Sequence, residues 1–180
     1  MTAATPGRAP LAHLRAGFTA AGVFAVAAAV QLAVGGPGSR WLAVHLFTVG
    51  VLSNLIVTLA PHFAATLLHA TERRAALPRL AVLNAGALLL AASGLRSAAL
   101  LAARATLLTA AVLWLWWDLR RMRKAALHPG RFGFVTRAYE RAAGAFVHGA
   151  LLGVLMGTGA LGGAWYAAAR LAHLLSLIHI

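Results

Sequence analysis

The hydrophobic residues of this 180-residue chain gather into six long runs, separated by short connections that are polar or contain Gly and Pro. The clearest run begins at Trp41 and continues to Ala60 without a formal charge. An α-helix rises about 1.5 Å per residue, so a run of this length crosses a hydrocarbon core of about 30 Å. The pattern therefore predicts an all-α fold, a bundle of helices that spans a membrane several times.

The runs predict five full spans and a truncated sixth. A cytoplasmic leader at residues 1–15 is expected to precede a transmembrane helix-bundle domain at 16–180. The spans are expected at about residues 16–35, 41–60 with an extension to 69, 77–95, 97–117, 139–160 and 165–180. The sixth run stops while still apolar, which predicts that the chain is a C-terminally truncated fragment of a longer protein.

The composition indicates a membrane protein, and this affects how the net positive charge is interpreted. Hydrophobic residues make up 61% of the chain and charged residues 11%, whereas soluble domains are about a quarter charged. The net charge of +13 would indicate nucleic acid in a soluble protein. Here the basic residues lie between apolar runs, where they set topology and meet anionic lipid, so no nucleic-acid partner is expected.

The distribution of basic residues predicts the orientation of the chain. Four of the 16 basic residues fall on one side of the predicted spans, namely Arg40, Arg96, Arg104 and Arg170, and the remaining twelve fall on the other. The positive-inside rule then places the N-terminus in the cytoplasm and the protein in the plasma membrane as a multi-pass protein. Arg104, inside the fourth run, is expected to extend outward to the interface.

The sequence contains no self-contained hydrolytic site. Its three acids, Glu72, Asp118 and Glu140, are all expected at the cytoplasmic interface, where they would balance nearby arginines. No carboxylate pair for acid–base catalysis and no Ser–His–Asp constellation can be assembled from them. The absence of cysteine excludes disulfides and thiolate metal sites. Whether the chain is part of an enzyme stays open.

Histidine is the remaining residue type with chemistry to offer. In the predicted orientation, His45 and His173 reach a similar depth in the outer half of the bundle, on two different helices. Neutral imidazole is a common ligand of haem iron and copper, and two such ligands suffice for a bis-histidine haem. His148 is a candidate third participant or proton relay, and His62 is a further candidate for cofactor binding. The alternative is that these histidines only donate hydrogen bonds within the bundle.

Other polar and small residues predict helix packing. Asn54 and Asn84 are expected to hydrogen-bond one helix to another. A stripe of glycines at four-residue spacing in the fifth run favours close approach of a neighbouring helix, either within the chain or in a homo-oligomer. These glycines are Gly149, Gly153 and Gly157.

The second run also carries a resemblance to a known kind of module. The matching residues are His45-Leu46-Phe47, Gly50, Ser53-Asn54, Ile56, His62-Phe63-Ala64 and Leu67-Leu68, with Leu83-Asn84-Ala85-Gly86 and Ala172-His173 further along. They resemble the N-terminal multi-helix module of actinobacterial multicopper oxidase and nitrite-reductase-like proteins, in which copper-binding cupredoxin domains follow. The module is distantly similar to NnrS-type proteins and to the haem–copper oxidase core subunit. The resemblance implies a redox function, with His45, His62 and His173 as ligands of haem or copper.

The leading hypothesis is therefore a membrane module of a redox protein. It would anchor a C-terminal cupredoxin domain in the lipid bilayer and bind haem or copper for electron transfer. The alternative is a structural membrane anchor or a small-molecule channel in which the histidines only pack.

Overall fold

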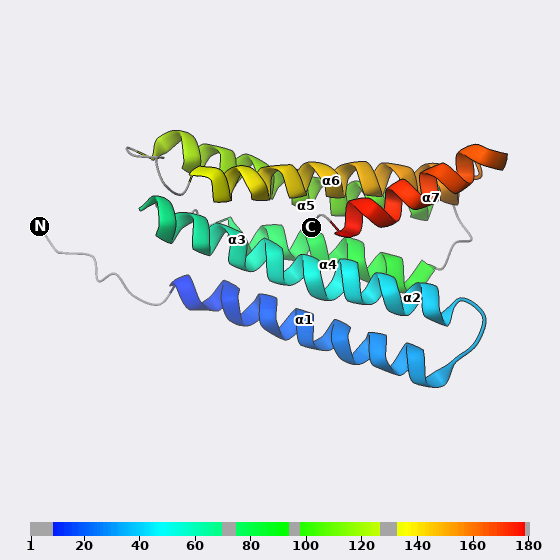
Figure 1. Cartoon of the computed structure of the whole chain (residues 1–180). Coiled ribbons are helices and arrows are strands. Elements are labelled where there is room, and N and C mark those ends of the chain that lie inside the picture. The colour runs from blue at the N-terminus through cyan, green and yellow to red at the C-terminus, as the bar shows by residue number, and fades with distance from the viewer. Residues whose placement is uncertain (1–8, 70–74, 94–97, 127–132, 179–180) are drawn as a thin grey trace, which may run out of the picture.

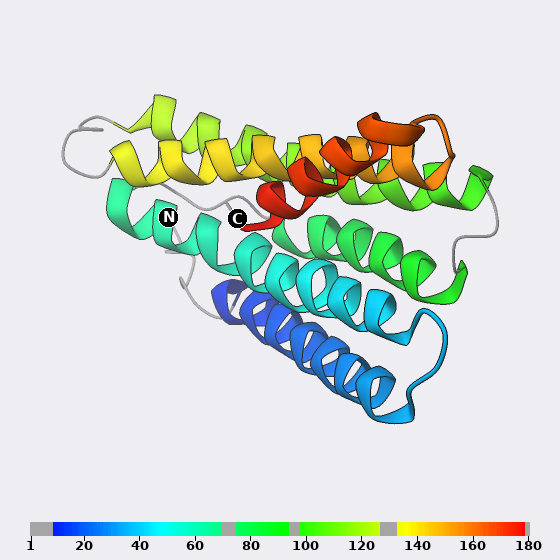
Figure 2. The same ribbon diagram turned by 45° about the vertical axis from the view of Figure 1, so that its right-hand side comes forward.

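The computed structural model describes residues 9–69, 75–93, 98–126 and 133–178, and the regular elements in these ranges are all helices. In chain order they are α1 (Ala9–Val34), α2 (Ser39–His45), η1 (Leu46–Leu52), α3 (Ser53–Leu68), α4 (Ala76–Ser93), α5 (Ala98–Ala125), α6 (Gly133–Gly157) and α7 (Gly163–Ile178). The long helices lie side by side with alternating direction, and α7 packs obliquely on α6 (Figure 1). Figure 2 shows that α1 lies at one edge of the bundle, next to the second run. The all-α prediction is confirmed.

The second hydrophobic run forms one long helix that changes its winding midway. Between α2 and α3 the segment η1 is a π-helix. The Ser53 hydroxyl donates to the Thr48 carbonyl at 3.2 Å, five residues back. Within η1, Gly50 lies against Phe24 of α1 so closely that an added Cβ would be 2.5 Å from the Phe24 Cγ. The extension predicted beyond Pro61 is confirmed, because α3 continues to Leu68.

The distribution of exposed and buried residues indicates a membrane protein. The outer surface of α1 is apolar, with Val23, Val26, Leu32 and Val34 all more than half exposed. The buried set includes polar and charged side chains: His13, Ser53, Asn54, Thr58, Arg79, Arg104, Asp118 and Thr136. Apolar side chains facing outward and polar side chains facing inward suit lipid as the surrounding solvent.

Among the residues that the structure describes, three helical segments are long and apolar enough to cross a membrane: Ala12–Val34, Ser39–Leu68 and Ala99–Ala125. The segment Ala76–Ala92 of α4 is a shorter apolar helix. The structure thus supports a membrane-spanning bundle, while the five full spans stay a prediction. Three predicted boundaries move by six residues or more, because α1 begins at Ala9 and not at 16, α5 continues past Trp117 to Ala125, and α6 begins at Gly133, before Tyr139. The added stretch of α5, from Asp118 to Ala125, is rich in charge, which hydropathy alone assigns to a loop.

The predicted hydrogen bonds between Asn54 and Asn84 are confirmed. Each amide nitrogen donates to the other side chain's oxygen at 3.0 Å, which joins α3 to α4. The same nitrogens also donate to backbone carbonyls four residues back, Gly50 at 2.7 Å and Leu80 at 2.8 Å. This reciprocal pair satisfies polar groups that would be costly in an apolar interior.

Pro61 lies inside α3, and a side chain of another helix replaces the backbone hydrogen bond that the proline removes. Proline has no N–H, so the carbonyl of Val57, four residues back, loses its usual helical donor. The guanidinium of Arg79 in α4 donates to that carbonyl at 3.3 Å. Arg79 also donates to the carboxylate of Asp118 in α5 at 2.7 Å. One arginine therefore connects three helices at the place where the proline interrupts the helical ladder.

This network corrects the positions expected for several charged residues. Arg79 is only 2% exposed and Asp118 only 3%, so both are buried in the bundle rather than solvated at the interface. Arg104 is likewise buried, not extended outward. The expectation that acids balance arginines is confirmed for Asp118 and for Glu140, which accepts two hydrogen bonds from Arg123 at 2.7 and 3.0 Å. Glu72 lies outside the described residues.

Candidate functional site: a histidine pair

His45 and His173 lie close together at the end of the bundle opposite the N-terminal end of α1. His45 is the last residue of α2, immediately before the π-helical segment, and His173 is in α7. Their ring centroids are 6.2 Å apart and the ring planes differ by 19°. The predicted approach of the two rings is therefore observed, and metal binding by them stays a prediction.

Each ring is oriented by a backbone carbonyl. The Nδ1 of His45 is 2.8 Å from the carbonyl oxygen of Trp41, and the Nδ1 of His173 is 2.8 Å from that of Gly149. A carbonyl oxygen only accepts, so each Nδ1 carries the proton. In the neutral rings Nε2 is then the unprotonated nitrogen with a lone pair. A donated N–H that fixes the ring is the usual second-shell arrangement of a histidine metal ligand.

An aromatic ring lies beside His45, and glycines of α6 lie beside His173. The indole ring of Trp41 lies 4.1 Å from the His45 ring, centroid to centroid. His173 lies over the glycine stripe of α6, where an added Cβ at Gly153 would be 3.4 Å from its Cε1. The ring of His173 therefore lies within van der Waals range of position 153 on α6.

The glycine stripe packs within the chain. Gly149 lies next to Ser176 of α7, and Gly157 faces Leu101 of α5. The predicted close approach of helices is confirmed at these positions. Association of two copies through the same stripe stays a prediction.

The spacing of the two rings suits coordination of one metal ion. A metal–nitrogen bond of about 2.0 Å plus a ring radius of roughly 1 Å puts each ring centre about 3 Å from a shared ion. Two rings on opposite sides of that ion are then about 6 Å apart, as the pair here is. Among the described residues no group of three or more His, Cys, Asp or Glu side chains gathers at one point. Within the described residues these two imidazoles are the candidate nitrogen ligands, and any further ligand would have to come from a macrocycle or from outside.

The other predicted site residues do not join the pair. His148 is exposed on α6, and its Nδ1 is 2.9 Å from the carbonyl oxygen of Gly144. His62 lies 17 residues beyond His45 on the same long helix, which corresponds to about 25 Å of helical rise. Its ring is 6.1 Å from that of Phe63. Any role for His62 or His148 would therefore be separate from the pair.

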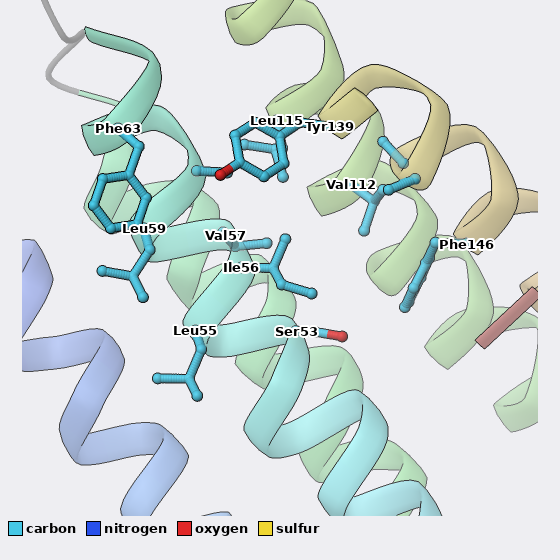
Figure 3. A pocket seen from close by; sticks show the side chains of 13 residues that line it. Ser53, Leu55, Ile56, Val57, Leu59, Phe63, Val112, Leu115, Tyr139 and Phe146 are labelled. Carbon is cyan, nitrogen blue, oxygen red and sulfur yellow. The ribbon is translucent and has the colours of Figure 1, made fainter. Parts of the chain in front are cut away.

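A second feature, which the sequence did not predict, is an apolar cavity of about 210 Å³ between α3, α5 and α6. Figure 3 shows Tyr139 reaching from α6 toward α3 among the aliphatic side chains of Val57, Leu59 and Leu115. Phe146 lines the same cavity three residues before Gly149, the acceptor for His173. Ordinary apolar residues form this space through tertiary packing, so their sequence pattern carries no signal of it.

The chain matches no known protein family, no characterised protein and no solved structure.

Proposed function

We propose that this protein is the membrane module of a redox protein, in which His45 and His173 bind haem iron or copper for electron transfer. The observation that supports it is the histidine pair, with both Nδ1–H groups donated to backbone carbonyls and ring centres 6.2 Å apart. The bound metal supplies the electron chemistry. The chain's own residues orient the two partly buried rings, through the carbonyls of Trp41 and Gly149.

The wider role is to anchor a catalytic domain. In this proposal the bundle crosses the plasma membrane with five full spans, with the N-terminus in the cytoplasm. The resemblance of the second hydrophobic run favours a cupredoxin domain of the oxidase or nitrite-reductase kind as the catalytic domain that the bundle anchors. The basic groups at the end where α5 stops and α6 starts favour this orientation, including Arg120 and Arg121 with their guanidinium carbons 5.1 and 4.8 Å from the rings of Trp116 and Trp117.

The experiment is an optical spectrum with metal analysis on detergent-purified protein, expressed with a haem precursor and with copper in the medium. A Soret band with sharp reduced α and β bands identifies a bis-histidine haem, and copper content without a Soret band identifies copper. We expect His45→Ala and His173→Ala each to lower the bound cofactor about tenfold or more, because each removes one of two ligands. His148→Ala, the exposed histidine on α6, is the matched control and should keep the cofactor.

The competing function is a structural anchor whose histidines only pack. Protein free of haem and copper under both supplements would favour it, as would a cofactor that persists in both His45→Ala and His173→Ala. Far-UV circular dichroism of each variant checks that loss of cofactor is not loss of the fold.

A further inference from the structure

We propose that the cavity between α3, α5 and α6 binds a membrane-soluble quinone, with its ring in the cavity and a ring carbonyl hydrogen-bonded to Tyr139. Quinone binding itself is a claim about this cavity alone. Its meaning as an electron source rests on the function proposed above for the histidine pair.

The size of the cavity selects a single ring. An apolar cavity of about 150 Å³ holds benzene, and the present one measures about 210 Å³. A six-membered ring with a few substituents therefore fits, whereas a haem macrocycle is too large. The wall is apolar, built from side chains such as Ile56, Val112 and Phe146. No lining residue is charged, so a ring that moves from lipid into this cavity does not have to desolvate a charged side chain.

One polar group distinguishes this cavity from a site for an acyl chain. The Tyr139 hydroxyl is directed from α6 toward α3 at the cavity (Figure 3), and within the described part of the chain it forms no hydrogen bond. Tyr139 is half-buried, and its hydroxyl is available to donate a hydrogen bond to an acceptor bound beside it. A saturated acyl chain supplies no acceptor, and a quinone carbonyl does.

The position of the cavity connects it to the membrane and to the histidine pair. Its lining residues come from α3, α5 and α6, and Phe63 among them is 46% exposed, so the cavity reaches the outer surface of the bundle near Phe63. A ligand dissolved in the bilayer can enter there with its isoprenoid tail left in lipid. Toward the other end, Ser53 is eight residues from His45, about 12 Å of helical rise.

The test is equilibrium binding of a benzoquinone with a short alkyl chain to the detergent-purified 180-residue protein. We expect saturable binding of about one quinone per chain. Tyr139→Phe removes the hydrogen bond and should weaken binding about tenfold. Ala143→Phe fills the cavity and should weaken it at least as much, while Ala138→Phe, on the exposed face of α6, should leave it unchanged.

Several results would overturn the proposal. Non-saturable uptake indicates partition into detergent, and equal competition by an alkane of the same chain length identifies an acyl-chain site instead. Unchanged affinity in Tyr139→Phe would show that Tyr139 does not hydrogen-bond the quinone. Unchanged affinity in a folded Ala143→Phe protein would show that the quinone binds outside this cavity. The measurement is repeated on the His45→Ala/His173→Ala protein, where binding should persist. Failure of the quinone site and failure of the metal site are thereby separated.

Discussion

At the scale of single residues, the polar groups inside this bundle satisfy one another in specific pairs. The amides of Asn54 and Asn84 exchange hydrogen bonds, and Arg79 donates both to Asp118 and to the carbonyl that Pro61 deprives of its donor. In lipid no water is available to replace these partners. Removing one partner of a pair should therefore lower the free energy of unfolding by more than the intact pair contributes to it.

The buried ion pair gives a direct test of this asymmetry. Arg79→Met leaves the Asp118 carboxylate buried without its guanidinium, and we expect a loss of about 3–5 kcal/mol in the free energy of unfolding. Asp118→Leu leaves the Arg79 guanidinium buried without the Asp118 carboxylate, and it should lower the free energy of unfolding by a similar amount. The Arg79→Met/Asp118→Leu protein should recover most of that loss, because no uncompensated charge remains. Denaturation in detergent followed by circular dichroism measures all three, and additive losses would contradict a coupled pair.

At the scale of elements, the contact between α1 and the π-helical segment depends on a glycine. The backbone of Gly50 lies directly against the ring of Phe24, and an added Cβ would be 2.5–2.7 Å from three Phe24 atoms. No flexible side-chain end is involved, since the closest atoms include the Phe24 Cβ and Cγ. A side chain at position 50 must therefore separate the two helices.

Gly50→Ala should destabilise the protein by about 1–3 kcal/mol, the cost of overpacking a close-packed interior. Gly22→Ala is the matched control on α1, because nothing lies within 4 Å of its added Cβ. That control should be neutral or stabilising by about 0.5–1 kcal/mol, because alanine favours a helix over glycine. Thermal unfolding of the two variants side by side is the measurement. Equal stabilities would show that α1 does not pack on η1 as described.

At the scale of the whole molecule, the sequence predicted the helices well and the interior only in part. Long apolar runs located the helices because lipid-facing surfaces must be apolar. The extra turns of α5 were missed because they are rich in charge, and Arg123 among them is paired across helices with Glu140 of α6. The earlier start of α6, at Gly133, was missed as well. The burial of Asp118 and Arg104 was missed for a related reason, since hydropathy does not show which side chains face inward.

The candidate site was predictable to a similar extent. Counting residues from each membrane face put His45 and His173 at one depth, and the structure brings them together. The same reasoning could not tell that His148 lies on the exposed face of α6, because its direction depends on how α6 packs on α7 and α5. The π-helical segment after His45 and the cavity near Tyr139 arise from tertiary packing of ordinary residues, for which the sequence has no periodic signal.

Orientation in the membrane can be measured with single cysteines, because the chain has none of its own. Thr158→Cys lies in the exposed turn after α6, and Lys124→Cys lies near the exposed end of α5. With the N-terminus inside, a membrane-impermeant maleimide should label position 158 in intact cells and position 124 only after lysis. The reverse pattern would invert the topology. Labelling of both positions in intact cells would contradict a bundle that separates them by a membrane.

The most direct test of the histidine pair is the electron paramagnetic resonance spectrum of the oxidised protein, prepared with both haem precursor and copper. A ferric bis-histidine haem and a cupric site each give a signal that reports nitrogen ligation. We predict such a signal in the unchanged protein and in His148→Ala, and its loss in His45→Ala and in His173→Ala. A spectrum without any metal signal, or one that survives both single substitutions, would contradict a metal centre held by this pair.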